Sequence, residues 1–199
     1  MKKLLITGFE PFGGEKINSS WEAVQRLPEK IYGYCITKLL VPVVFGEAAE
    51  MVIAAADEIC PDVILCIGQA GGRSAITPEL VAINLCHASI PDNRGNQPQD
   101  EPIIPGGDCA YFSGLPMRAI AEKINAAGIA SQLSYSAGAY VCNDLIYTLL
   151  SHFKNSKTEV GFIHVPYSKE QGKEPSMDLD DIAKGLTLAI ETIDAEIEI

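Results

Sequence analysis

The run Val63-Ile64-Leu65-Cys66-Ile67 passes directly into the glycine-rich turn Gly68-Gln69-Ala70-Gly71-Gly72-Arg73. A short apolar run that ends in turn residues is typical of a strand inside a sheet that is covered on both faces. Further runs of this kind lie at Lys3–Thr7, Tyr34–Val43, Glu79–Cys86, Ser131–Tyr135 and Val160–Val165. Longer helical patterns alternate with these runs, at Ala48–Ile59, Met117–Ala127, Asp144–His152 and Leu179–Ile193. The alternation predicts an α/β fold with a mostly parallel sheet and helices on both faces.

Length, composition and charge narrow the class of protein. The 199 residues fit a single domain, residues 1–199, because no shift in composition marks a boundary. Hydrophobic residues make up 47% of the chain and charged residues 21%, as in an ordinary globular protein. The formal net charge of −11, from 15 Lys and Arg against 26 Asp and Glu, repels nucleic-acid phosphates and anionic lipid surfaces. We therefore expect neither nucleic acid nor a membrane as a partner.

The cysteines and the first residues indicate the compartment. Six cysteines are scattered along the chain without a CxxC pair, unlike a secreted disulfide scaffold. Three separated histidines and these unpaired cysteines offer no zinc-ligand spacing, so no metal is expected. The apolar run after Lys2 and Lys3 is too short for a secretion signal and is better interpreted as a first strand. We expect reduced thiols in a cytoplasmic protein.

Four of the predicted strands end in unusual loops, which are Gly8-Phe9-Glu10-Pro11-Phe12-Gly13-Gly14, the turn at 68–73, the turn before Cys142, and His164-Val165-Pro166. The carboxyl ends of parallel strands face one way, and ligands bind in the crevice outside them. These loops are therefore expected to converge on one site. The segment from Ile90 to Gly107 is long, polar and rich in turn formers, which predicts a loop or lid.

One cysteine stands out by its position in the chain. The stretch Ser136-Ala137-Gly138-Ala139-Tyr140-Val141-Cys142-Asn143 is a turn of mostly small residues that leads into the helical pattern from Asp144. Unpaired N–H groups and aligned dipoles at a helix amino terminus favour negative charge, which predicts a lowered pKa for the Cys142 thiol and a nucleophilic thiolate. The alternative is an inert core thiol, because cysteine is among the most often buried residue types.

A nucleophilic thiol needs a base. His164 ends a nearly all-apolar strand before Pro166, so its ring is expected to emerge at the crevice as a general base. The alternative is a histidine whose polar groups are satisfied within the core. The other two histidines, His87 and His152, are expected to be structural.

The imidazole also needs an orienting acid, and spacing alone does not choose one. Five carboxylates lie near predicted loops, namely Glu10, Glu79, Asp92, Asp108 and Asp144. Glu79 follows Pro78, whose restricted backbone could aim the carboxylate at an imidazole N–H. The alternative is a solvated carboxylate at the start of a strand.

Aromatic and glycine residues outline a possible pocket. Phe9 and Phe12 stand three residues apart in a Gly/Pro-rich turn, where two rings can hold a flat ligand or form a small local core. The glycines at 68–72 permit close backbone approach, and their N–H groups could cradle a phosphate or a neutral amide. Neither glycine loop matches a dinucleotide-binding or Walker motif.

With these residues in view, the chain resembles the pyroglutamyl-peptidase family, also called pyrrolidone-carboxylate peptidases. These are cysteine exopeptidases that remove an amino-terminal pyroglutamate. The resemblance runs essentially end to end, through the ordered blocks 8–14 with Asn18, 68–73, 76–79, 81–84, 90–93, 110–112, 136–138, 141–143 and 162–166.

The resemblance implies a role for each reacting group. Cys142 would be the nucleophile of a thioester mechanism, His164 the base and then the acid, and Glu79 the carboxylate that orients the imidazole. The family's fold is a three-layer α/β/α sandwich. Its members are often homotetramers without any cofactor, and the expected partners are peptides or proteins with an amino-terminal pyroglutamate.

The resemblance also implies a substrate pocket. Phe9 and Phe12 would line the pyrrolidone pocket, backbone groups near Gln69 would bond the lactam, and Asn18 would support the loop. Two positions depart from the family pattern: Ser89 stands where an arginine often precedes Ile-Pro-Asp-Asn, and Ser19 stands where a proline is usual. Neither change removes a reacting group, so we expect them to affect rate and pocket rigidity.

The residues alone also allow a second class of function. Similar α/β sandwiches hold nucleosides, and the loop Gly71-Gly72-Arg73 could accept phosphate in a phosphorolytic enzyme or a non-catalytic binder. Phosphate would then enhance activity or thermal stability, whereas a thiol alkylator would abolish the activity of a peptidase. A cysteine at a helix start that faces a strand-end histidine favours the peptidase.

Overall fold

The computed structural model describes residues 1–196 and has a central sheet of six strands in the order β2-β3-β1-β4-β8-β5. The strands are β1 (Lys2–Phe9), β2 (Lys30–Ile31), β3 (Tyr34–Val41), β4 (Val63–Gln69), β5 (Thr77–Glu79) and β8 (Glu159–Val165). The four inner strands β3, β1, β4 and β8 are parallel, while β2 and β5 pair antiparallel at the two edges. The predicted mostly parallel sheet is confirmed for these inner strands.

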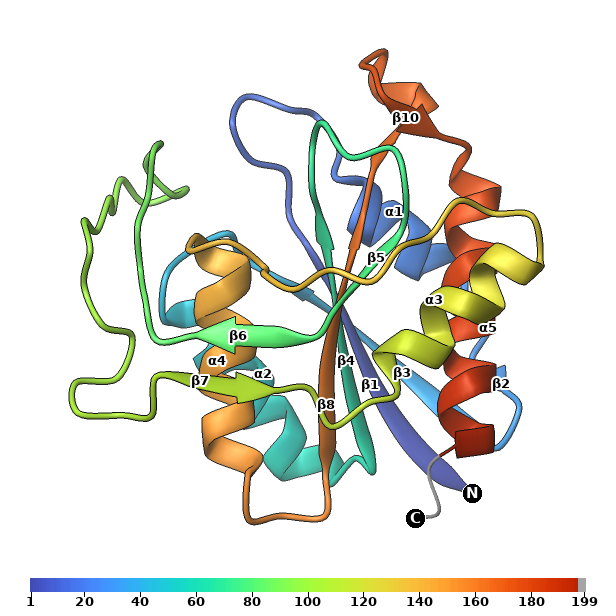
Figure 1. Ribbon diagram of the computed structural model, residues 1–199, viewed down its shortest axis with the longest axis horizontal. Coiled ribbons are helices and arrows are strands. Elements are labelled where there is room, and N and C mark those ends of the chain that lie inside the picture. The colour runs from blue at the N-terminus through green and yellow to red at the C-terminus, as the bar shows by residue number, and fades with distance from the viewer. Residues whose placement is uncertain (197–199) are drawn as a thin grey trace.

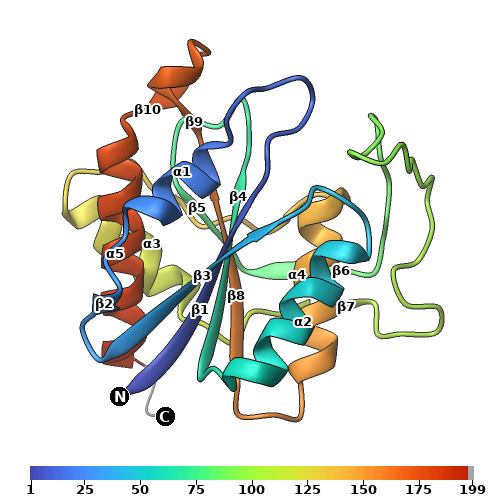
Figure 2. The same cartoon turned by 180° about the vertical axis from the view of Figure 1, so that it is seen from behind.

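Helices cover both faces of the sheet, which gives three layers (Figure 1). On one face lie α1 (Ser19–Arg26), α3 (Met117–Ala126) and α5 (Leu179–Glu196), and on the other α2 (Glu47–Ile59) and α4 (Val141–Phe153). Figure 2 shows the same layers from behind, with the inner strands between the two helical groups. The predicted α/β/α architecture is confirmed.

The inner strands are buried on both faces because their residues alternate between two apolar clusters. In β8, Val160 and Phe162 pack with the α2 and α4 cluster, whereas Ile163 and Val165 belong to the cluster under α1, α3 and α5. Full burial of one such side chain contributes roughly 1.5–3 kcal/mol. The same alternation decides which face of the sheet receives His164, the residue between Ile163 and Val165.

The predicted strand Glu79–Cys86 is wrong as a single element. The chain leaves the main sheet at Leu80, so that β5 pairs with β8 while β6 (Val81–Ile83) pairs with β7 (Ala110–Phe112) in a separate two-stranded sheet. A third sheet, also of two strands, joins β9 (Tyr167–Ser168) and β10 (Ser176–Met177). These strands lie on either side of the short 3-10 helix Lys169–Gln171 in the sequence.

The predicted strand Ser131–Tyr135 is also not formed as such. It runs as an extended segment beside β5 with isolated bridges, Ile76 to Ser131 and Glu79 to Ser134. Helix α1 was not predicted, because it is only eight residues long. Its amino terminus is capped by Asn18, whose side chain accepts a hydrogen bond from the Ser20 backbone N–H.

The long segment between β6 and β7 is a loop, as predicted, and it extends away from the body of the molecule beside α4 (Figure 1). Asp92 organises its tip by accepting hydrogen bonds from the N–H groups of Arg94 and Asn96 and from the Asn96 amide. The Phe45 backbone N–H also donates to Asp92, which ties the loop to the chain after β3. Within residues 1–196, no helix is both long enough and apolar enough to cross a membrane.

Candidate active site

The first turn of α4 meets the sheet at the carboxyl ends of its inner strands. The helix begins at Val141, three residues before the predicted start, so Cys142 lies inside the first turn. The carbonyl of Tyr140, the residue before the helix, accepts hydrogen bonds from the N–H groups of Asn143 and Asp144. The Asn143 side chain holds β6 by accepting from the Ile83 N–H and donating to the Ile83 and Leu85 carbonyls. These contacts fix the position of the thiol.

The Cys142 sulfur lies over Gly68 at the end of β4. A Cβ atom at Gly68 would lie 3.1 Å from Sγ of Cys142 and 2.7 Å from Cζ of Phe162. Gly68 is directly opposite His164 in the parallel pairing of β4 with β8, and side chains at paired positions point to the same face. The structure therefore brings the thiol and the imidazole to one face of one strand pair. Glycine at position 68 leaves room for both the Phe162 ring and the Cys142 sulfur.

Glu79 contacts the same imidazole from the neighbouring edge strand. Nδ1 of His164 lies 2.7 Å from Oε1 of Glu79, and both side chains are buried. The antiparallel pairing sets Thr77 opposite His164 and Glu79 opposite Phe162, so Glu79 lies on the same face of the sheet as His164. An ionised carboxylate only accepts hydrogen bonds, so the proton sits on Nδ1. The lone pair of a neutral ring is then on Nε2, on the side away from Glu79.

The other four candidate carboxylates serve elsewhere. Glu10 accepts from the Asn93 amide, Asp92 organises its loop, and Asp144 accepts from the Gly46 N–H at the start of α2. Asp108 accepts from the Tyr111 hydroxyl. Of the five carboxylates, Glu79 is the one in contact with His164.

Arg73 completes this group, although the sequence did not single it out as a partner of the acid. Its Nη1 donates to Oε1 of Glu79 at 2.6 Å and lies 2.5 Å from Oγ1 of Thr77. Its Nη2 donates to the carbonyl of Ser136 at 3.4 Å. The sequence left open whether the loop that ends at Arg73 receives a phosphate or a neutral amide. In the structure the Arg73 guanidinium is bound to the buried acid Glu79.

Burial and the neighbouring polar groups act in opposite directions on the pKa values of Glu79 and His164. Burial alone raises the pKa of Glu79, but interactions with His164, Ser134 and Arg73 outweigh it and lower that pKa below its usual value. Burial lowers the pKa of His164, the neighbouring Glu79 opposes this by raising it, and the net pKa is lowered. At neutral pH the site therefore holds an ionised Glu79 and a neutral His164.

The thiol does not have the lowered pKa that was predicted from the helix terminus. Cys142 remains partly exposed at the pocket, but the protein around its sulfur raises the pKa to about 12. The negative charge of Glu79 acts in the same direction, and Arg73 opposes it. Desolvation therefore raises the pKa of Cys142 by more than the helix terminus lowers it. The thiol is therefore protonated at rest and needs a base to become a nucleophile.

A small pocket opens beside the sulfur, about 280 Å³ including its mouth. It is lined by Phe9, Phe12, Asn18, Val43, Gln69, Tyr140 and Cys142. Five of these seven residues were predicted from the sequence. They come from the carboxyl ends of β1 and β4, from the loop after β1 and from the start of α4. Val43 and Tyr140 were not predicted. Tyr140 packs edge-on against Phe45 and donates its hydroxyl to the Pro91 carbonyl, so it joins the pocket to the long loop.

The polar side of the pocket is held by a short network. Asn18 donates its amide to the Glu10 carbonyl, which supports the first loop. Oε1 of Gln69 accepts from both the N–H and the hydroxyl of Ser19, at 2.9 and 3.1 Å. A backbone N–H can only donate, so Oε1 must face Ser19 and the amide nitrogen of Gln69 lies on the other side. Ser19 thus supplies two donors that fix a pocket residue, whereas a proline at this position would supply neither.

The remaining histidines lie outside this group. Nδ1 of His87 is 2.9 Å from Asp100 on the surface, and His152 packs edge-on against Phe153. Among residues 1–196, no three His, Cys, Asp or Glu side chains are grouped so as to hold a metal ion.

Comparisons with known proteins agree on one family. The family model for pyroglutamyl peptidase matches residues 2–196. A pyrrolidone-carboxylate peptidase of Levilactobacillus brevis is 50% identical over 198 residues, covering 96% of this chain and 97% of that protein. One from Escherichia fergusonii is 49% identical over 207 residues, covering 99% and 96%. The crystal structure of Bacillus amyloliquefaciens pyroglutamyl peptidase I has a TM-score of 0.94 at 47% identity and covers 98% of both chains.

Proposed function

The chain belongs to the pyroglutamyl peptidase family of hydrolases, which remove amino-terminal pyroglutamate, and we propose that Cys142, His164 and Glu79 perform this reaction through a thioester. The observation that carries the proposal is the buried His164–Glu79 hydrogen bond beside a thiol at the mouth of an apolar pocket. A protonated thiol and a neutral imidazole are the resting partners of a general-base mechanism.

The reaction proceeds in two halves. Nε2 of His164 takes the proton of the Cys142 thiol as sulfur attacks the pyroglutamyl carbonyl, and the imidazolium then gives that proton to the departing amine as the C–N bond breaks. Water, activated by the same nitrogen, attacks the thioester, releases pyroglutamate and restores the thiol. Glu79 holds the ring in one tautomer throughout and stabilises the imidazolium that forms in each half.

The developing oxyanion is stabilised at the start of α4. The N–H groups of Asn143 and Asp144 already donate to the Tyr140 carbonyl, whereas the N–H of Cys142 points to its own sulfur. The Cys142 N–H, which belongs to the attacking residue itself, is therefore the donor that we assign to the oxyanion. In other hydrolases one such donor contributes about 2.7–4 kcal/mol to transition-state stabilisation.

Selectivity follows from the pocket lining. Phe9, Phe12 and Tyr140 supply apolar surface for a flat, uncharged ring, and polar groups at Gln69 bond its amide. An ordinary charged amino terminus would lose its hydration in the same pocket without an acidic partner among the lining residues. The enzyme would thus select the lactam by rejecting charge.

The test compares hydrolysis of a chromogenic L-pyroglutamyl amide with that of the matching prolyl amide. The wild type should cleave the first and not the second, and Cys142→Ala should lower kcat/KM by roughly 10⁴-fold or more. Cys109→Ala, at an exposed free thiol, is the matched control and should leave turnover unchanged. Undiminished turnover by Cys142→Ala would end the thiol mechanism, and equal turnover of the prolyl amide would end the claimed selectivity.

Two further expectations extend the proposal. The family resemblance favours a homotetramer, and the scattered, unpaired cysteines favour a reducing cytoplasm. Light scattering on the purified chain should give four times the mass of 21.4 kDa. A mass equal to one chain would contradict the tetramer.

A further inference from the structure

We propose that Arg73 is a positioning residue for this reaction, which holds the Glu79 carboxylate where it can accept from His164 and ties that acid to the segment that carries Cys142. The inference rests on the proposed function of Cys142 and His164. It concerns a residue that touches neither the thiol nor the pocket lining, so Arg73 acts through Glu79.

The first support is that Arg73 and His164 share one oxygen. Oε1 of Glu79 is 2.6 Å from Nη1 of Arg73 and 2.7 Å from Nδ1 of His164. The Glu79 side chain is 1% exposed and that of Arg73 is 30% exposed, so the guanidinium is the link between a buried acid and the surface. An ionised carboxylate at such depth is strongly disfavoured without a charged partner. Arg73 supplies that partner while His164 stays neutral.

The ionised state of Glu79 matters because it decides the tautomer of the ring. A protonated carboxyl can donate to Nδ1, and the ring proton would then move to Nε2. Nε2 would no longer accept the proton of the Cys142 thiol. Arg73 therefore maintains the proton arrangement in which His164 is a base.

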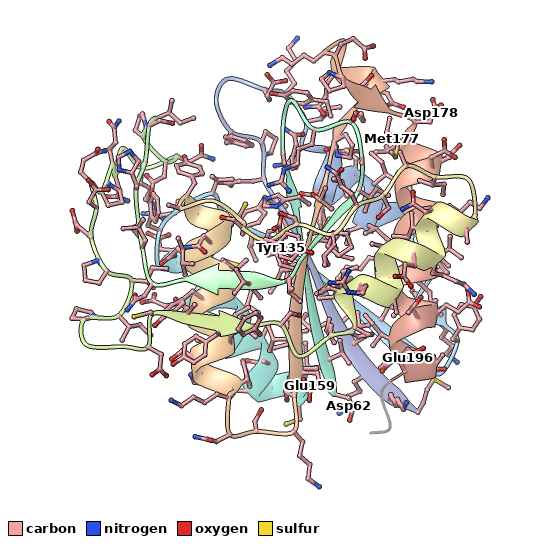
Figure 3. The ribbon with its side chains drawn as sticks, viewed as in Figure 1. Asp62, Tyr135, Glu159, Met177, Asp178 and Glu196 are labelled. Carbon is pink, nitrogen blue, oxygen red and sulfur yellow. The ribbon has the colours of Figure 1, made fainter. Side chains whose placement is uncertain are left out.

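The second support is the reach of the guanidinium across three segments. Arg73 follows β4, its Nη1 meets Thr77 and Glu79 on β5, and its Nη2 donates to the Ser136 carbonyl. Ser136 belongs to the extended segment that crosses the β5 edge and leads into α4. Figure 3 labels the exposed Tyr135 on this segment, in front of the sheet. One side chain thus connects the strand with the acid to the segment with the thiol.

The charge of Arg73 has a measurable consequence. The titratable and charged groups that face His164 are Glu79 on β5, Arg73 after β4 and Cys142 on α4, with Cys66 on β4 behind the thiol. The hydrogen bond from Arg73 lowers the pKa of Glu79, and the positive charge of Arg73 lowers the pKa of His164. Without it the pair binds a proton more readily, whichever of the two groups holds that proton. The acid limb of kcat/KM, which reports loss of the free base, should then move to higher pH.

The experiment compares Arg73→Gln and Arg73→Lys with wild type and with Arg26→Gln, a control at an exposed ion pair with Asp180. Arg73→Gln should lose kcat on the order of 10- to 100-fold with little change in KM, and its acid limb should shift upward. Arg73→Lys keeps the positive charge but not the planar guanidinium with its several N–H donors. It should therefore lose less kcat than Arg73→Gln and keep the wild-type midpoint of the acid limb. Arg26→Gln should match wild type.

A second readout needs no substrate. The chain has three histidines, so the His164 ring signals can be assigned in an NMR titration by their absence from His164→Gln. The His164 midpoint should rise in Arg73→Gln and should stay at the wild-type value in Arg26→Gln. In Arg73→Gln, a loss of kcat with an unchanged His164 midpoint would mean a merely structural role and would overturn the proposal. Wild-type kinetics of Arg73→Gln would also overturn it.

Further results separate this inference from the proposed function. Should Arg73→Gln fail to fold, a shifted midpoint in the charge-preserving Arg73→Lys variant would contradict the proposal, and an unshifted midpoint with reduced kcat would support it.

A wild type that cleaves no pyroglutamyl amide would refute the proposed function. The NMR midpoint would still report whether Arg73 controls the buried pair. In a Glu79→Gln background, Arg73→Gln should have little further effect on kcat, because the carboxylate that Arg73 holds is already absent.

Discussion

Residues 1–196 contain two histidine–carboxylate pairs with similar N–O distances and opposite surroundings. His164 and Glu79 are 2.7 Å apart with side chains 5% and 1% exposed, while His87 and Asp100 are 2.9 Å apart with side chains 45% and 77% exposed. The buried pair adjoins a thiol, an arginine and a pocket; the exposed pair lies on the long loop that leaves the body of the molecule. Distance alone therefore does not make a histidine a base.

Burial changes what the same contact does. Water competes for both partners of the exposed pair and screens their charges, so such a pair contributes about 0–1 kcal/mol. In the buried pair, desolvation lowers the pKa of His164 and keeps its Nε2 lone pair free, while Glu79 stays ionised because Arg73 and His164 both contact it. The buried pair has a defined tautomer and direction, which are the properties that a general base requires.

The largest expected difference between the pairs comes from removing each histidine. His164→Gln should lower kcat by roughly 10⁴- to 10⁶-fold, because the thiol, with its pKa of about 12, then has no base. His87→Gln should retain wild-type turnover. Steady-state hydrolysis of a pyroglutamyl amide measures both, and similar losses in the two variants would erase the distinction drawn from burial.

Changing the carboxylates should have a smaller effect. Glu79→Gln keeps the size of the side chain but lets its amide donate to Nδ1, so the ring adopts the wrong tautomer; a comparable change in serine proteases costs about 10⁴ in kcat. We expect a loss of about 10²- to 10⁴-fold here.

The control for that change is Asp100→Asn. Asp100 has a φ of 55°, a backbone conformation that asparagine tolerates well, so the variant should fold and turn over normally. A Glu79→Gln enzyme as active as Asp100→Asn in the same assay would show that the carboxylate does not orient the imidazole.

The strands and helices with a strong apolar pattern could be predicted from the sequence. Those that depend on contacts with distant parts of the chain were missed. The apolar runs of β1, β4 and β8 need two covered faces, so their burial can be inferred locally. Helix α1 is short and begins at buried serines, Ser19 and Ser20, whose contacts lie far along the chain at Gln69 and within the Asn18 cap. The break at Leu80 depends on which sheet each half joins, and no local pattern shows that.

The site divides in the same way. Cys142 and His164 were predictable because each stands at the end of a recognisable element. The choice of Glu79 among five carboxylates required the antiparallel pairing of β5 with β8, or the family resemblance. Arg73 was missed as a partner of the acid because it was considered only as part of a glycine-rich loop that could receive a phosphate or a neutral amide. The pKa of the thiol was predicted in the wrong direction, since burial outweighs the helix terminus and burial cannot be read from one motif.

Covalent labelling tests the central claim most directly, that the buried base serves one thiol beside a lactam pocket. The wild type would be treated with the chloromethyl ketones of pyroglutamate and of proline, and the modified peptides identified by mass spectrometry. The account predicts that the pyroglutamyl reagent alkylates Cys142 alone among the six cysteines, faster than the prolyl reagent, and that His164→Gln slows this labelling. Equal rates for the two reagents, or label at the exposed Cys60 and Cys109 in preference to Cys142, would contradict it.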